Sequence, residues 1–342
     1  MRKPLFIAFQ IAAIYIGTVV GAGFATGKEI VAFFTKYHEG GLVGIILSTI
    51  LLSILSEKMM LIGKRINAQS YQELNIYLFG PFFGNIVNGI MIITLIGVTS
   101  VMLSGAGAIF EEQLSLSKIM GIIITIVLAI YVMKYGVKGL SSVNVFVVPI
   151  FIFFSIILAG DTFHFKSISL ENVSFNIGLL ASGSSFLYAA FNLTLAQAVL
   201  VPLATQINHE KAIRLGARIG GIGLGLILLL SHIALLSLPN VESFDIPMAQ
   251  LVKGSLSSIY YLYLLVIFGE VFTSVIGNLY GIERQLKAKF HFSSTKIVSS
   301  VLFIAFFISL IGYSDLITRL YPLFGYMSIV FILCLTIKKV PH

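Results

Sequence analysis

One apolar stretch of the chain carries a carboxyl group and two hydroxyl groups at a spacing that suits a cation. Glu270 is followed by Thr273 and Ser274, and residues three and four positions apart lie on one face of a helix. These side chains offer only oxygen atoms, the ligand type that hard cations prefer. Because an ionisable group inside a membrane span is costly and usually functional, this face is a candidate site for a hard cation.

Two other interpretations of this face stay open. Hydroxyl groups in apolar helices often bond back to the carbonyl one turn earlier, which would make Thr273 and Ser274 purely structural. Alternatively, a low-dielectric environment without a compensating cation favours the protonated form of a carboxyl. Glu270 would then take up and release a proton.

Two further stretches are unusually long and are interrupted near their centres. Residues 5–35 would make a helix about 47 Å long, well beyond a bilayer core of about 30 Å, yet glycine recurs at positions 17, 21, 23 and 27. Each glycine weakens a helix by about 1 kcal/mol relative to alanine. Residues 175–206 are equally long, with a polar, glycine-containing centre at 182–192. Both are predicted to be broken helices, whereas close helix packing is the alternative explanation of the small residues.

Paired broken helices in corresponding positions indicate the central binding site of a transporter. Non-helical backbone is predicted between Val20 and Phe24 and between Tyr188 and Asn192. The amides near Gly21 would suit a carboxylate, because helix starts carry a positive partial charge. The candidate substrate site comprises Val20, Gly21, Ala22, Gly23, Phe24, Tyr188, Ala189, Phe191 and Asn192.

Three rings of this candidate site, those of Phe24, Tyr188 and Phe191, would enclose an apolar side chain. An amino acid is therefore the first candidate for the substrate. An amine or another small organic solute stays open, because aromatic walls also suit cations.

The composition requires lipid as the solvent for these elements. The chain has 342 residues, of which 58% are hydrophobic and 11% charged, and its mean hydropathy is +1.01. Soluble domains carry roughly 25% charged residues, and a span needs about 20 apolar residues. The fold class is therefore an all-α membrane protein with about ten transmembrane helices. The predicted spans are residues 5–35, 40–63, 82–110, 118–134, 142–160, 175–206, 216–238, 255–282, 297–314 and 317–337.

The distribution of charge predicts the orientation. Most of the 22 lysines and arginines fall in short loops on the side of both termini, and basic residues accumulate in cytoplasmic loops. Both termini are thus predicted to be cytoplasmic, in a multi-pass protein of the cell membrane. Residues 1–342 are expected to form one transmembrane domain, with repeat one at 1–160 and repeat two at 171–337. An odd number of spans in each half would orient the repeats oppositely.

Particular strings resemble a known group of transporters. Gly17-x-x-Val20-Gly21-x-Gly23 resembles the unwound first helix of the LeuT fold. Phe186-x-Tyr188-x-Ala190-Phe191-Asn192 is similar to the broken sixth helix of the amino acid–polyamine–organocation (APC) superfamily, which usually has Gly and Asp where this chain has Ala190 and Asn192. The string from Gly21 to Glu29 resembles the YkvI-type membrane proteins, a branch of that superfamily.

This resemblance implies a LeuT-like 5+5 inverted repeat with broken helices 1 and 6, and a sodium site. Its ligands would be the backbone carbonyls of Gly17, Val20 and Glu270 and the hydroxyls of Thr273 and Ser274. The family commonly has a small residue where this chain has Glu270. The fifth span lacks the interior lysine of proton-coupled relatives, which favours sodium.

The sequence accordingly indicates a secondary active transporter, with sodium-coupled symport of an amino acid or similar solute by alternating access. One alternative is a proton-coupled carrier that uses Glu270, and another is a sensor or receptor subunit that binds a small molecule without moving it. No phosphate-binding loop or catalytic constellation is recognisable, so an enzyme is not expected. Sodium is the one expected bound ion, without other cofactors. The expected partners are a small-molecule substrate and lipid, with no nucleic acid and no obligate protein partner.

Overall fold

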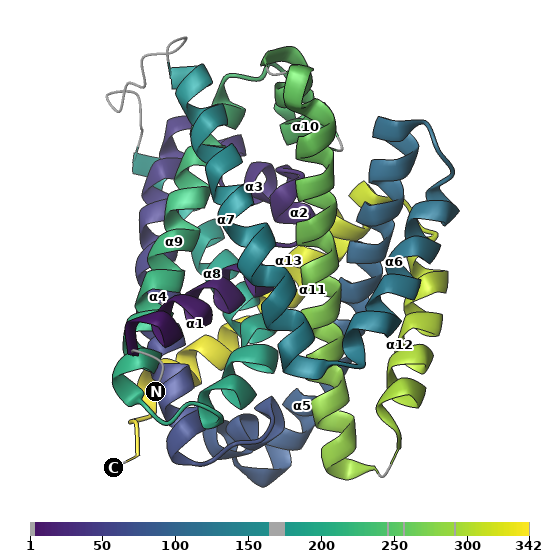
Figure 1. The fold of residues 1–342 in the computed structure, drawn as a ribbon. Coiled ribbons are helices and arrows are strands. Elements are labelled where there is room, and N and C mark those ends of the chain that lie inside the picture. The colour runs from purple at the N-terminus through teal and green to yellow at the C-terminus, as the bar shows by residue number, and fades with distance from the viewer. Residues whose placement is uncertain (1–3, 164–174, 245, 256, 291, 342) are drawn as a thin grey trace.

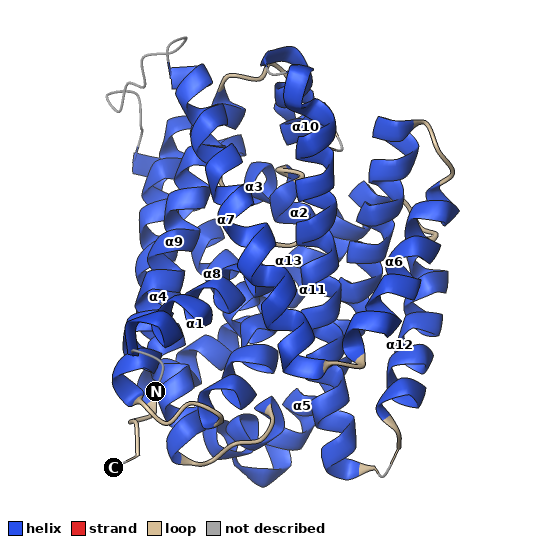
Figure 2. Cartoon of the chain, viewed as in Figure 1, coloured by secondary structure: helices blue, strands red, loops and turns tan. Residues whose placement is uncertain are grey.

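The computed structural model describes residues 4–163, 175–244, 246–255, 257–290 and 292–341. All the regular elements in these ranges are helices (Figure 2). In chain order they are α1 (Pro4–Val19), α2 (Ala22–Ala25), α3 (Lys28–Phe33), η1 (Thr35–Gly40), α4 (Gly41–Arg65), α5 (Tyr71–Ala108), η2 (Ile109–Gln113), α6 (Lys118–Met133), α7 (Gly136–Phe163), α8 (Phe175–Thr205), α9 (Glu210–Leu236), η4 (Val241–Ser243), α10 (Pro247–Ser255), η5 (Ser257–Ile259), α11 (Tyr260–Lys289), α12 (Ser294–Ser309) and α13 (Tyr313–Ile337).

Helix length and surface chemistry make the chain a multi-pass membrane protein. Within the described ranges, six helices are long and apolar enough to cross a bilayer, in α4, α5, α8, α9, α11 and α13. The other four predicted spans fall on the shorter apolar helices α1, α6 and α12 and on the apolar part of α7. Large apolar side chains such as Phe82, Phe146 and Leu265 are exposed, as expected where lipid replaces water.

The first long stretch is interrupted, as predicted, but within the predicted break the non-helical backbone is limited to Val20 and Gly21, and Ala22 to Phe24, also predicted to be non-helical, lie in the turn α2. Helix α1 ends at Val19, the single turn α2 begins at Ala22, and α3 begins at Lys28 after a second interruption. Gly27 adopts φ +85°, a left-handed conformation that glycine adopts at no steric cost. At Gly21 a Cβ atom would lie 2.5 Å from Cε of Met102, so the backbone approaches its neighbour more closely than a side chain allows.

The second long stretch contradicts the prediction, because α8 is one continuous helix from Phe175 to Thr205. Several of its polar residues bond to carbonyls of the helix itself, whereas the hydroxyl of Ser184 donates to the carbonyl of Phe33 at 2.8 Å. The side-chain amide of Asn192 donates to the backbone carbonyl of Tyr188 at 3.1 Å. The hydroxyl of Ser185 donates to the backbone carbonyl of Ser182 at 2.7 Å. Where the resembled family has glycine the chain has Ala190, and alanine is the strongest helix former. The predicted break between Tyr188 and Asn192 is therefore wrong.

The helices form a bundle in which the broken first stretch lies centrally (Figure 1). Helix α1 packs on α9 and α7, α4 packs on α8 and α9, and α11 packs on α5 and α7. The described chain begins and ends at one end of the bundle, whereas α10 lies at the other (Figure 1). Helix α5 contains a reversal at Gly80, with φ +79° and ψ 172°. The segment before the reversal, from Tyr71 to Phe79, is a short helix that precedes the predicted span 82–110.

Candidate ion and substrate site

The α11 face marked out by its hydroxyls lies directly against the break in the first stretch. The hydroxyl of Ser274 donates to the carbonyl of Val20 at 2.8 Å. The hydroxyl of Thr273 is shared between the carbonyl of Gly17, at 3.3 Å, and that of Glu270 in its own helix, at 2.9 Å. Thr273 therefore bonds both to the carbonyl one turn earlier in its own helix and to the carbonyl of Gly17 in α1.

The break supplies the acceptors for these hydroxyls. In an unbroken helix the carbonyls of Gly17 and Val20 would accept from the amides four residues later. Because α1 ends at Val19, carbonyls of its last turn lose such partners. The three carbonyls of Gly17, Val20 and Glu270 and the two hydroxyls thus lie within one buried cluster, here called the oxygen cluster. Such a set of oxygens can ligate a hard cation.

The carboxyl group of Glu270 is buried beside the oxygen cluster. The residue is 0% exposed, and within the described part of the chain neither carboxyl oxygen has a hydrogen-bond partner. Burying an ionised carboxylate without a partner is strongly unfavourable. The group is therefore suited to holding a proton or to lying next to a bound cation.

A second buried carboxyl, that of Glu29, was missed by the sequence analysis. It is the second residue of α3 (Lys28–Phe33) and lies in the last part of the predicted span 5–35, and the residue is only 2% exposed. Its Oε1 accepts from Nδ2 of Asn192 in α8 at 3.3 Å. The signal available in the sequence was its place just after a glycine-rich break, which turns the next residues back into the bundle.

The predicted substrate residues of α8 face α3 and α13. The ring of Tyr188 packs edge-on against Phe33 and Phe34, with centroids 5.5 and 4.9 Å apart. The ring of Phe191 packs against Tyr321 of α13 with centroids 4.8 Å apart. Together with Asn192, these residues surround the inner face of α3, whereas Ala189 is buried within the helix packing.

Residues of the break itself lie in two directions. Phe24 packs edge-on against Phe151 of α7, with ring centroids 6.2 Å apart. Its ring therefore points towards α7 and not towards Tyr188 and Phe191 of α8. The amide of Ala22 points at the thioether sulfur of Met102 at 3.0 Å, which is a weak acceptor. Gly23 faces the side chain of Glu29, because a Cβ atom there would lie 2.8 Å from Oε2.

The segment after the break is tied to the end of the bundle that carries α10. The ammonium of Lys28 donates to the carbonyls of Glu242 and Phe244 at 2.9 and 2.8 Å, so it does not pair with Glu29. The carbonyl of Thr26 accepts from the amide of Met248 at 3.0 Å, and its hydroxyl lies 2.9 Å from that of Tyr313. These contacts cover the break from that side.

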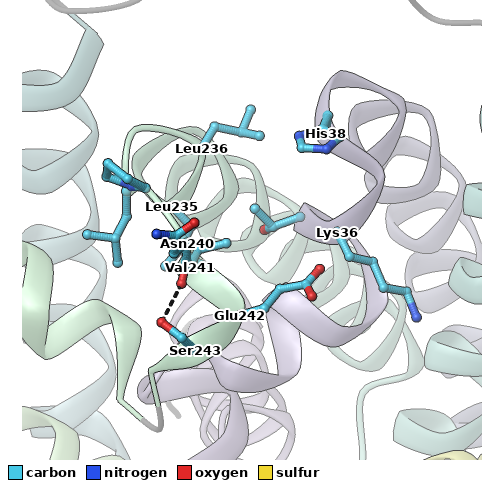
Figure 3. A pocket seen from close by; sticks show the side chains of 11 residues that line it. Lys36, His38, Leu235, Leu236, Asn240, Val241, Glu242 and Ser243 are labelled. Atoms are coloured by element: carbon cyan, nitrogen blue, oxygen red, sulfur yellow. Dashed lines mark hydrogen bonds between the residues drawn. The ribbon is translucent and has the colours of Figure 1, made fainter.

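Two surface hollows lie near this covered end. One, of about 590 Å³, lies between η1 and the α9–α10 connection (Figure 3). There Lys36 and His38 come from η1, and Asn240 and Glu242 come from the connection (Figure 3). The other is a groove of about 750 Å³ between the α3–η1 segment, α8 and α13, whose lining includes Phe33 and Tyr321. The groove therefore reaches the aromatic group around Glu29.

No family model matches the chain, but its sequence is closely similar to one curated protein. It is 51% identical over 348 residues to the uncharacterized membrane protein YkvI of Bacillus subtilis strain 168. The alignment covers 100% of this chain and 99% of that relative. The likeness therefore extends over the whole length of the chain.

The fold is similar to those of two solved transporters. Mhp1, a nucleobase-cation-symport-1 family transporter in a closed conformation with bromovinylhydantoin bound, matches with a TM-score of 0.59 and 14% identity. That match covers 92% of this chain and 74% of Mhp1. A manganese transporter of Eremococcus coleocola matches with a TM-score of 0.58 and 15% identity over 96% of this chain and 76% of its own. At such identities the shared property is the fold, which for Mhp1 is LeuT-like.

Proposed function

The chain belongs to the YkvI family of membrane proteins, and from this premise we propose that it is a secondary active transporter that couples uptake of a small organic solute to sodium. An amino acid or a similar solute is the proposed substrate. The protein would lie in the cell membrane with ten spans, two oppositely oriented repeats and both termini in the cytoplasm. No chemical transformation of the solute is part of this role.

The observation that carries the proposal is the oxygen cluster at the break. Thr273 and Ser274 donate to the carbonyls of Gly17 and Val20 across the contact between α1 and α11. A cation placed there would accept lone pairs from the same carbonyl and hydroxyl oxygens, with the hydroxyl protons turned away. Binding would thus link a broken helix to a continuous one, which is how an ion can bias the position of a moving element.

The fold supports a carrier of this kind. The two similar structures are transporters by their descriptions, one with a hydantoin bound and one for manganese. Irregular backbone at membrane depth is tolerated where protein or a water-filled cavity surrounds it. In this chain the break contributes carbonyls to the oxygen cluster, and Gly23 beside it faces Glu29 and Tyr321, so an ion and a solute would both bind at the same segment.

Alternating access would require the contacts over the break to open and close. In this structure Lys28 and Thr26 tie the segment after the break to the α9–α10 connection, α10 and α13. Release of these contacts would expose the break to the side that carries α10, which is the outer side in the proposed orientation. Sodium in the oxygen cluster would stabilise this outward-open form and raise the affinity for solute.

A proton-coupled carrier is the second candidate, and one observation favours it. Both carboxyl oxygens of Glu270 lack a hydrogen-bond partner among the described residues, and a proton would neutralise the group without any other ligand. Sodium remains our proposal because the two hydroxyls and three carbonyls already converge beside this carboxyl.

Uptake into proteoliposomes tests both candidates. Purified protein is reconstituted, and uptake of labelled amino acids is measured with an inward sodium gradient, with potassium in its place, and with an inward proton gradient at fixed sodium. We expect stimulation by sodium and little response to the proton gradient. Uptake that persists in potassium, follows the proton gradient and is abolished by Glu270→Gln would establish the proton-coupled carrier instead. Binding without uptake under all conditions would indicate a sensor.

A further inference from the structure

Glu29 is a buried carboxyl whose surroundings provide too little positive charge. It accepts one hydrogen bond from the described residues, from Asn192 at the long distance of 3.3 Å. No ion pair to it is present within the described ranges. The adjacent cation, Lys28, is held by two backbone carbonyls on the other side of the segment. A carboxylate in such a position is stable only if a cation or a proton joins it.

Two phenol groups share this position and also lack partners. The hydroxyls of Tyr188 and Tyr321 make no hydrogen bond to the described residues, and the two residues are 0% and 1% exposed. Both interact electrostatically with Glu29. Oε2 of Glu29 and Cε2 of Tyr321 each lie within 3.2 Å of the point where a Cβ atom on Gly23 would stand. The carboxyl of Glu29, the amide of Asn192 and the ring of Tyr321 therefore meet beside the break, and the phenol of Tyr188 lies close enough to interact with the charge of Glu29.

The walls around these polar groups are aromatic. Phe33 and Phe34 pack on Tyr188, and Phe191 packs on Tyr321. Aromatic faces attract cations through their quadrupole, and the carboxylate and the phenol oxygens are hydrogen-bond acceptors. A ligand with several N–H donors and one positive charge would satisfy all of these groups at once, whereas a neutral or anionic group would leave the carboxylate uncompensated.

We propose that Glu29, Tyr188, Asn192 and Tyr321, here called the ammonium cage, bind the ammonium group of the solute. The substrate is then an amine or an amino acid that enters with its ammonium nitrogen towards Glu29. This inference rests on the transport role proposed above and specifies the class of its substrate. The groove lined by Phe33 and Tyr321 ends at rings of this aromatic group and gives such a solute a route to the cage.

Thermal melting of the purified full-length protein tests the cage directly. The probes are the common amino acids and simple aliphatic and aromatic primary amines, each measured beside its N-acetyl derivative, which lacks the charged ammonium. We expect that at least one ammonium compound stabilises the protein and that its N-acetyl derivative binds about tenfold more weakly or worse. The proposal is overturned if no ammonium compound binds, or if the N-acetyl derivatives bind equally well.

Variants then assign the binding to the cage. Glu29→Gln preserves the shape of the side chain and should weaken binding about tenfold or more. Tyr321→Phe removes only an unpartnered hydroxyl, so the fold should persist while binding weakens about threefold. Glu242→Gln, which removes a carboxyl outside the cage at the same end of the bundle, is the matched control and should bind as wild type. Wild-type affinity in both Glu29→Gln and Tyr321→Phe would overturn the cage.

The same proteins in liposomes separate this inference from the proposed function. Ammonium-dependent binding that is lost in Glu29→Gln, without any uptake by the wild type, would support the cage and contradict transport. Uptake with an unchanged KM in Glu29→Gln would support transport and overturn the cage. If uptake by the wild type depends on a proton gradient, and Glu29→Gln loses that dependence but still binds amines, then Glu29 carries a proton and does not bind the ammonium group. This result too would overturn the cage.

Discussion

The first long stretch and α8 have similar length and apolar character, yet one is broken and the other is continuous. At the break, the carbonyls of Gly17 and Val20 accept from hydroxyls of another helix. In α8, Asn192 and Ser185 bond to carbonyls of their own helix. The difference teaches that polar residues alone do not interrupt a membrane helix. Repeated glycine does so when a neighbouring element satisfies the backbone groups that the break releases.

The largest expected effect follows from removing the hydroxyls that serve the break. In the double variant Thr273→Ala/Ser274→Ala, two of the proposed ligands are lost, and we expect sodium affinity to fall at least about tenfold. Stabilisation by sodium, relative to potassium, in thermal melting provides the measurement. The matched control is Ser182→Ala/Ser185→Ala in α8, whose hydroxyls bond within their own helix and should leave the sodium response unchanged. Equal loss in both proteins would remove the distinction between the two stretches.

A substitution at Gly27 should destabilise the broken stretch. Gly27 has a φ of +85°, and an alanine in this left-handed conformation raises the free energy of the folded state by roughly 1–2 kcal/mol. The new Cβ would also lie 2.6 Å from Cγ of Met248. We expect Gly27→Ala to lower the melting temperature of the purified protein. A melting temperature equal to wild type would show that this second interruption is not required by the packing.

Gly21 offers a sharper measurement, because an added Cβ meets the oxygen cluster itself. The atom would lie 2.5 Å from Cε of Met102 and 3.1 Å from the hydroxyl of Ser274. The end of the Met102 side chain can move away, but the hydroxyl of Ser274 is fixed by its hydrogen bond to the carbonyl of Val20. We therefore expect Gly21→Ala to reduce sodium affinity about threefold to tenfold, and adding Met102→Ala should restore stability without restoring that affinity. Restoration of both would assign the effect to the methionine alone.

The smallest expected effect has the opposite sign and lies in α8. A Cβ on Gly183 would meet no atom within 4 Å, and alanine stabilises a helix by up to about 1 kcal/mol relative to glycine. Gly183→Ala should leave the melting temperature unchanged or raise it slightly. A clear decrease in melting temperature would indicate that α8 adopts a conformation with a break near this glycine. The two stretches would then both contain a break.

Glu270 and Glu29 show how much of the candidate site could be predicted from the sequence. Glu270 lies inside an apolar stretch with hydroxyls at helical spacing, so its chemistry is visible in the sequence. Glu29 stands next to Lys28 after a glycine-rich break, and two adjacent charged residues give no sign that one of them is buried. Its burial depends on the direction in which α3 leaves the break, and no local pattern encodes that direction.

The sequence by itself determined that the chain spans a membrane several times, that its first stretch breaks near Val20 and Gly21, and that Glu270, Thr273 and Ser274 share one face of α11. These properties follow from composition, glycine spacing and helical periodicity, which act within a single segment. Only the tertiary structure decided that α8 continues through Asn192, that Phe24 turns towards α7, and that Glu29 faces Asn192 and two tyrosines. Each of these depends on which neighbour satisfies a backbone or side-chain group, and such neighbours lie far away along the chain.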